Sequence, residues 1–342
     1  MTSISKDIFA EINPVPEVIL GEDESLDAYF AQRKPFVVRG LVNDWPLVQA
    51  GLSSGKAARQ YLLNRHQDRP FVISIGPEDA EGRIFYNNDM SMNIQMGRAK
   101  LPEIFERMDR IENDEKLPIM YLASIDMQAY FKDLAEANTV DLGARDLIES
   151  IWIGTRTRIA AHNDFPDNLA CVAVGHRRFT LFPPEQFRNL YLGPVDNTPA
   201  GRAVSMVDFH NPDFVKHSKF REAVKHAQVA NLSPGDAVFI PSLWWHHVEG
   251  LDAFNVLVNY WWRETPKHLG QPQNALNHAM MAIRDLPDDE KKIWRDLFDY
   301  YVFNNTDDVV NHIPEFGRGI LDTMTAENSS KIRTYLLRAL NQ

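Results

Sequence analysis

The chain has 342 residues, a formal net charge of −11, 44% hydrophobic residues and 24% charged residues. This composition is ordinary for a soluble globular protein, and the acidic balance disfavours a non-specific grip on nucleic acid or on an anionic membrane. No stretch approaches 18 uninterrupted apolar residues, the opening segment lacks a secretory-signal pattern, and Cys171 is the only cysteine. We therefore expect a cytoplasmic enzyme or binding protein without a membrane span or an internal disulfide.

Residues 1–117 are expected to form an N-terminal flanking region that mixes helices with strands. Within it, residues 24–32 place Leu26, Tyr29 and Phe30 on one helical face. Runs of β-branched and aromatic residues then predict strands, of which the last opens the next region: 35–38, 70–75, 83–86 and 118–123.

Residues 118–265 have an almost purely β pattern. The predicted strands are 150–154, 169–174, 179–182, 237–240 and 255–261. Turn-forming residues separate several of these runs, at Gly175-His176, Pro183-Pro184 and Pro234-Gly235-Asp236. Repeated short strands without long helices between them indicate a closed or nearly closed antiparallel barrel or jelly roll.

Residues 266–342 change to a helical pattern. Helices are predicted to begin near Pro272 and Pro287, and a third covers 331–340. Apolar side chains lie on more than one side of these helices. Two interpretations stay open, namely a helical cap folded onto the barrel and a homodimer interface.

His162 and Asp164 are the first candidate metal ligands. On an extended backbone their side chains point to the same face, because strand side chains alternate with period 2. One distant histidine would complete a set of two imidazoles and one carboxylate on one side of a metal ion, as in oxygen-activating Fe(II) sites. Taken alone the pair is a weak signal, since Asp164 could instead cap a turn before Pro166.

The segment Trp244-Trp245-His246-His247-Val248-Glu249 offers that distant histidine. Strand alternation separates the face of His246 from the face of His247 and Glu249. The first face carries apolar neighbours and is expected to point inward, whereas the face that ends in Glu249 is expected to be more solvated. We therefore select His246 as the ligand; the alternative is a core histidine bonded to a backbone carbonyl.

Arg177 follows the Gly175 turn and shares a strand face with Phe179 and Leu181. An arginine at the head of an apolar face either reaches to the surface or meets a buried anion. Its planar guanidinium can hold a carboxylate through two parallel hydrogen bonds. The distal carboxylate of 2-oxoglutarate fits this role.

An ordered set of motifs extends this pattern over residues 118–263. It comprises His162-x-Asp164, Asn168, the Gly175 turn, Leu181-Phe182-Pro183-Pro184, Val207-Asp208-Phe209-x-Asn211-Pro212-Asp213, Pro234-Gly235-Asp236, Ile240-Pro241, Trp244-Trp245-His246-His247 and Val258-Asn259-Tyr260-Trp261. In these motifs the chain resembles the JmjC/cupin-like hydroxylases, and most of all their factor-inhibiting-HIF asparaginyl hydroxylase branch.

The resemblance implies a mainly β fold, a double-stranded β-helix (jelly roll) with flanking helices and a C-terminal helical region that dimerises. It implies that Fe(II) is held by His162, Asp164 and His246. The implied contacts to 2-oxoglutarate are made by Tyr121, Asn168, Arg177 and Asn259. The implied activity is an Fe(II)- and 2-oxoglutarate-dependent dioxygenase that uses O2 to hydroxylate a side chain of a protein or peptide.

The sequence departs from that branch at three positions. Arg177 stands where the branch usually has lysine, Ile159 where it has a threonine, and Ala123 at a place that contacts the substrate asparagine. The substrate is therefore not carried over. A small-molecule hydroxylase, a non-catalytic dimeric cupin and a cupin that binds another metal without 2-oxoglutarate stay as alternatives.

Overall fold

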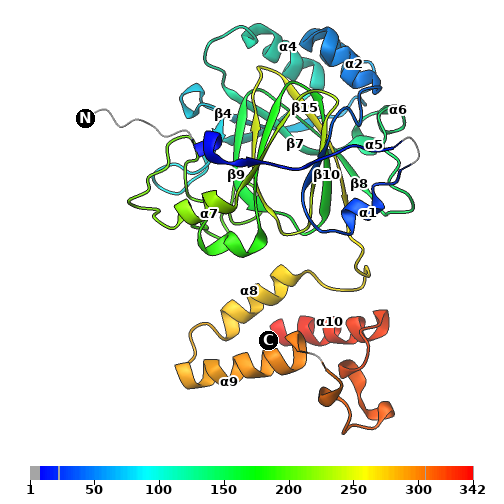
Figure 1. The fold of residues 1–342 in the computed structure, drawn as a ribbon, viewed down its shortest axis with the longest axis vertical. Helices are drawn as coiled ribbons and strands as arrows, with labels where there is room; N and C mark the ends of the chain where they lie inside the picture. Colours follow the sequence, from blue (N-terminus) through cyan, green and yellow to red (C-terminus); the bar gives the residue numbers. More distant parts are fainter. Residues whose placement is uncertain (1–7, 22–23, 305, 342) are drawn as a thin grey trace. The chain divides into compact units, whose positions relative to one another are not determined.

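The computed structural model describes residues 8–21, 24–304 and 306–341. It consists of two compact units, residues 1–263 and residues 264–342. The first unit contains all the strands, and the second is helical (Figure 1).

Two sheets of mixed direction form the first unit. The six-stranded sheet has the order β1 (Asn13–Pro14), β12 (Gln228–Leu232), β11 (Arg177–Phe182), β14 (Trp245–Gly250), β9 (Thr157–Asn163) and β5 (Arg83–Ile84). The nine-stranded sheet has the order β2 (Glu17–Val18), β3 (Phe36–Val38), β13 (Ala237–Ile240), β10 (Asp167–Val174), β15 (Asn255–Trp262), β8 (Ile148–Gly154), β7 (Ile119–Asp126), β4 (Phe71–Gly76) and β6 (Gln95–Ala99). Most pairs are antiparallel, and the predicted mainly β, jelly-roll fold with flanking helices is confirmed.

The core between the sheets combines alternating side chains from both. Phe179, Leu181 and Val248 come from the six-stranded sheet, and Val172 and Leu257 come from the nine-stranded sheet. In the strands that supply these residues, the expected alternation therefore places one face in this core and the other on the opposite side of the sheet.

Helices pack against the nine-stranded sheet on its other face. They are α1 (Asp27–Phe30), α2 (Pro46–Ser53), α3 (Gly55–Leu63), α4 (Leu101–Ile111), α5 (Met127–Tyr130) and α6 (Leu134–Ala137). In α4 the buried side chains Leu101, Ile104, Phe105 and Met108 follow helical spacing, and the Glu103 carboxylate accepts a hydrogen bond from the backbone N–H of Lys100. The helix predicted over 24–32 is only the single turn α1.

Strands from the predicted N-terminal region are part of the same sheet as the jelly-roll strands. β3 pairs with β13, and β4 pairs with β7. β1 and β5 join the six-stranded sheet. The polypeptide before residue 118 therefore contributes strands to both sheets.

The turn between β10 and β11 depends on Gly175. Its φ of +73° lies in the left-handed region, and a Cβ there would come within 2.6 Å of Asn255 Oδ1 and 2.7 Å of the Phe254 carbonyl oxygen. Only glycine avoids both the unfavourable dihedral and the close contacts. The turn brings Arg177 onto β11 at a fixed register opposite Gly250.

The second unit contains α8 (Pro272–Ala282), α9 (Asp288–Phe298) and α10 (Ala326–Leu340). The first two begin where the sequence predicts, whereas α10 begins five residues earlier than predicted, because the Thr325 hydroxyl caps the backbone N–H of Asn328. No helix within the described ranges is long and apolar enough to cross a membrane.

Candidate metal centre and active-site pocket

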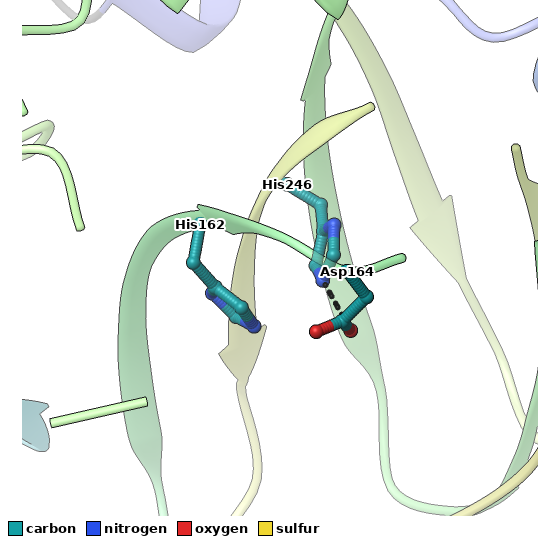
Figure 2. Close-up of side chains that lie close together, drawn as sticks. All are labelled: His162, Asp164 and His246. Atoms are coloured by element: carbon teal, nitrogen blue, oxygen red, sulfur yellow. Dashed lines mark ion pairs between the residues drawn. The ribbon is translucent and has the colours of Figure 1, made fainter. Parts of the chain in front are cut away.

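The side chains of His162, Asp164 and His246 lie close together (Figure 2). His162 lies near the end of β9, Asp164 follows that strand, and His246 is paired with His162 in register on β14. The imidazole centroids of the two histidines are 4.3 Å apart, and His246 Nε2 lies 3.5 Å from Asp164 Oδ2. One ligand atom from each of the three residues lies within 4.8 Å of the other two.

Hydrogen bonds to the backbone set which nitrogen of each imidazole faces the centre. Nδ1 of His162 contacts the carbonyl oxygen of Ala160 at 2.9 Å, and Nδ1 of His246 contacts that of Trp244 at 3.0 Å. A carbonyl oxygen only accepts, so each Nδ1 carries the proton and donates. Each Nε2 is thereby directed to the centre, as a metal-binding histidine requires.

The charges at the centre also suit a divalent cation. Burial lowers the pKa of His162 to about 4, so its imidazole is neutral at neutral pH. Burial acts to raise the pKa of Asp164, but the hydrogen bond and charge of His246 outweigh it and lower the pKa to about 2. Aspartate binds a metal ion as the ionised carboxylate, and histidine binds it as the neutral imidazole with a free lone pair. The three residues therefore fit Fe(II) or a similar cation.

A pocket of about 230 Å³ adjoins this centre and brings the other predicted site residues to it. Tyr121 enters from β7, Asn168 from β10, Arg177 from β11 and Asn259 from β15. All seven residues selected from the sequence thus line one pocket. The walls between them include Ile159, Phe179, Val248 and Leu257.

Arg177 is 2% exposed, so it does not reach to the surface. Within the part of the chain that the structure describes, its Nε has no hydrogen-bond partner, and the titratable group whose charge acts on it is Tyr121 rather than a carboxylate. Burial lowers the pKa of Arg177 to about 10, which still leaves it charged at neutral pH. A buried charge without a partner is costly, so this guanidinium calls for an anion in the pocket.

Tyr121 and the two asparagines surround the same space. Burial raises the pKa of Tyr121 to about 12, against the opposing charge of Arg177, so its hydroxyl remains a donor. The Asn259 amide donates to Asn168 Oδ1 at 3.2 Å and accepts from Trp152 Nε1 at 2.7 Å. Trp152 also lines the pocket, and it was missed in the sequence because it looks like any half-buried strand aromatic.

The Asp167 side chain links two segments near the centre, those of Ser242 and Arg33. One carboxylate oxygen accepts a hydrogen bond from the backbone N–H of Ser242 at 2.8 Å, and the other forms an ion pair with Arg33 at 2.6 Å. The Asp164 carbonyl accepts a further bond from the N–H of Leu243 at 2.8 Å. The segment before His246 is thus anchored to the segment that carries Asp164.

One expectation about β14 is wrong. The face of His247 and Glu249 was expected to be solvated, but His247 is 5% exposed and Glu249 is 1% exposed. The segment around Phe209 covers this face, since the rings of Phe209 and His247 lie 4.6 Å apart. Burial by a segment distant in sequence cannot be predicted from the local alternation of a strand.

Comparison with known proteins gives consistent matches. A family model described as a cupin-like domain matches residues 22–268. The chain is 31% identical over 138 residues to HSPB1-associated protein 1 of Homo sapiens, which covers 39% of this chain and 27% of that protein. It is 32% identical over 126 residues to lysine-specific demethylase JMJ31 of Arabidopsis thaliana, and this match covers 35% of this chain and 22% of that protein. It is 23% identical over 324 residues to tRNA wybutosine-synthesizing protein 5 of Homo sapiens, and this match covers 83% of this chain and 92% of that protein. The first two matches therefore span less than a third of those relatives.

Proposed function

Because the chain belongs to the cupin-like domain family, we propose that it is an Fe(II)- and 2-oxoglutarate-dependent dioxygenase that hydroxylates a side chain of a protein or peptide. The observation that carries the proposal is the combination of the His162, Asp164 and His246 centre with the buried, unpaired Arg177 in one pocket. A bound metal ion accounts for the three ligands. A dicarboxylate that binds this ion at one end and Arg177 at the other accounts for both features.

In this proposal each residue of the pocket has one role. His162, Asp164 and His246 hold Fe(II), which when bound supplies the activation of O2 and the oxidative decarboxylation of 2-oxoglutarate to succinate and CO2. Arg177 pairs with the distal carboxylate of the co-substrate, and the protonated hydroxyl of Tyr121 donates to the same group. These residues position the co-substrate, and the apolar walls limit the access of water.

Asn168 and Asn259 act as positioning residues for the co-substrate. The hydrogen bonds from Trp152 to Asn259 and from Asn259 to Asn168 fix the orientation of both amides. Each amide therefore presents a defined donor or acceptor to the pocket, without loss of rotamer entropy when the co-substrate binds.

The size of the pocket favours a protein or peptide substrate over a free metabolite. About 230 Å³ lies below the usual range of small-molecule pockets, roughly 300–1,000 Å³, and the co-substrate occupies part of it. The remaining space suits one inserted side chain. A small-molecule hydroxylase is the second candidate, and the mass of the product formed from candidate peptides or amino acids separates the two.

The similarity to the asparaginyl hydroxylase branch remains a prediction of the sequence. One relative is named a lysine-specific demethylase and another a tRNA wybutosine-synthesizing protein, so the relatives differ in what they act on. The net charge of −11 supports a substrate other than nucleic acid, and a cytoplasmic location is part of the proposal.

A homodimer formed through the C-terminal helices is also part of the proposal. Large apolar side chains of this unit remain exposed on all three helices: Leu276, Met281, Ile293, Trp294, Leu297, Tyr335, Leu336, Leu337 and Leu340. Helices of a soluble monomer seldom expose so many large apolar side chains to water. The same helices in a second copy of the chain offer a matching apolar surface.

An anaerobic titration of the metal-free protein with Fe(II) and 2-oxoglutarate tests the proposed function. The expected result is a visible charge-transfer band of the chelate that is absent in His246→Ala. Binding of Fe(II) without any effect of 2-oxoglutarate would show that Arg177 serves another anion. Absence of both signals would favour a non-catalytic cupin module.

A further inference from the structure

A second cluster of metal-binding groups lies on the outside of the six-stranded sheet, and it is called here the outer cluster. It consists of His210, His247 and Glu249, and one ligand atom from each lies within 4.8 Å of the other two. His247 and Glu249 are two apart on β14 and face the same way. His210 comes from the segment that covers this face.

The outer cluster is distinct from the pocket. On β11 and β14 the inner face carries Leu181 opposite His246, whereas the outer face carries Thr180 opposite His247. The pocket is lined by His246 and Val248 but not by His247 or Glu249. The sheet therefore separates the two groups of residues.

Several buried polar atoms of this face have no hydrogen-bond partner among the described residues. They are both ring nitrogens of His247, Oε2 of Glu249 and Oγ1 of Thr180. Buried polar atoms are nearly always paired, and leaving one unpaired costs roughly 1–3 kcal/mol. Four such atoms on three side chains of one sheet face point to a ligand that the described residues do not supply.

The chemistry of the cluster selects a cation. His210 Nε2 is hydrogen-bonded to Glu249 Oε1 at 2.5 Å, and His247 Nε2 lies 3.9 Å from Glu249 Oε2. Two imidazoles and a carboxylate are the ligand set of many zinc sites. Zn–N distances of about 2.0 Å place neighbouring ligand atoms about 3.3 Å apart, so only small side-chain movements are needed.

Access to the cluster comes through His210, whose side chain is 43% exposed. Its ring can turn from the Glu249 carboxylate to a shared ion, and solvent can occupy a fourth position. Arginine side chains nearby oppose a cation, notably Arg178 at 3.8 Å from Glu249 Oε2. Asp208 offsets part of this charge, since it lies 3.3 Å from Arg83 and 3.8 Å from Arg158.

We propose that the outer cluster is a second divalent-cation site, of the zinc type, in which His210, His247 and Glu249 are the protein ligands. The ion ties the segment of His210 to β14, next to His246, and so has a structural role. This inference does not rest on the proposed oxygenase activity, because the two sites share no ligand.

The test counts Co2+ bound per chain after dialysis, together with the visible absorption of the bound ion. Wild-type protein is expected to hold two equivalents, and the double variant His162→Ala/Asp164→Ala one. Adding His210→Ala to the double variant is expected to remove the remaining equivalent. His210→Ala alone, at a half-exposed position that does not endanger folding, is expected to lower two equivalents to one.

A matched control distinguishes a built site from surface binding. His226 is also about half exposed and also contacts a glutamate, Glu222, at 3.1 Å. His226→Ala is expected to leave the second equivalent unchanged. The proposal is overturned if the double variant holds no Co2+, or if its Co2+ survives His210→Ala, which would identify an adventitious ion only.

Melting temperature provides a second readout. Zn2+ is expected to raise the melting temperature of the double variant, and this rise is expected to disappear with His210→Ala but not with His226→Ala. An equal rise in both variants would contradict the assignment of His210 as a ligand.

Discussion

His246 and His247 are consecutive on β14, and their imidazole rings lie on opposite faces of the six-stranded sheet. His246 belongs to the pocket, and His247 packs against Phe209 on the outside. The Nδ1 of His246 is held by a backbone carbonyl, whereas His247 has no hydrogen-bond partner among the described residues. One strand thus supplies ligands to two candidate cation sites of the same ligand type.

Removal of the Asp164 carboxylate should abolish Fe(II) binding in the pocket. Asp164→Ala leaves two imidazoles without their negative partner, so we expect the chelate band to vanish and succinate formation to fall by more than about 100-fold. Asp285→Ala is the control, because Asp285 is exposed and belongs to the helical unit. Succinate formation at the wild-type rate in Asp164→Ala would contradict the ligand assignment.

Substitution of Arg177 should weaken 2-oxoglutarate binding more than metal binding. Arg177→Met removes a charged hydrogen-bond donor, and we expect the dissociation constant of 2-oxoglutarate to rise on the order of 10- to 100-fold. Arg177→Lys should give a smaller rise, because it keeps the charge but loses the paired geometry. The titration of the chelate band measures both.

Arg178→Gln is the matched control for this series, since the neighbouring side chain points to the other face of β11 and bonds Asn231 at 3.0 Å. Its affinity for 2-oxoglutarate should equal that of wild type. Equal losses at both positions would mean that the effect comes from damage to β11 rather than from a lost contact.

Stability of the metal-free protein should fall as the pH falls from about 6.5 towards 4. Burial lowers the pKa of His162 and of His247 to about 4, below the ordinary value of 6.5. In this window the unfolded chain binds protons at these positions and the folded chain does not, so acid favours unfolding. Each histidine contributes a slope of about 1.4 kcal/mol per pH unit. Urea unfolding at several pH values measures this, and His247→Gln should reduce the slope.

Gly175 and Gly201 should respond differently to substitution by alanine. Both have positive φ, but only at Gly175 would a Cβ meet close atoms. Gly201→Ala is expected to cost about 1–2 kcal/mol from the dihedral, and Gly175→Ala about 2–5 kcal/mol because crowding is added. Urea unfolding gives both values, and equal losses would show that the contact with Asn255 is relieved at no cost.

The C-terminal helices should hold two copies of the chain together. Light scattering is expected to give twice the chain mass of 39.2 kDa. Ile293→Glu places a charge on an exposed apolar position of α9 and should shift the protein towards monomer. Lys292→Glu, its neighbour, is the control. A monomeric wild type would remove the proposal of a homodimer.

Much of the fold could be predicted from local sequence patterns. The strands around Val172 and Val258 and the helix starts at Pro272 and Pro287 follow from hydrophobic runs and from proline and glycine positions. The choice of His246 over His247 rested on strand alternation and on an apolar inner face beside a solvated outer one. The structure places His246 in the pocket, although the outer face is buried as well.

What local patterns could not supply is the environment created by distant segments. The burial of Glu249 depends on the segment that carries Phe209 and His210, some forty residues away. Likewise the role of Trp152 as a partner of Asn259 depends on the pairing of β8 with β15. Both contacts join residues far apart in the chain, so no local pattern in a single sequence predicts them.

The ion pair between Arg33 and Asp167 has a practical consequence for any attempt to shorten the protein. Arg33 lies far outside the predicted barrel region of 118–265, yet Asp167 uses its other oxygen to hold Ser242, four residues before His246. A fragment that begins at residue 118 would lose this anchor together with β3 and β4. Expression of the barrel alone should therefore yield a loosened candidate metal centre, and a fragment intended for metal studies should begin before α1.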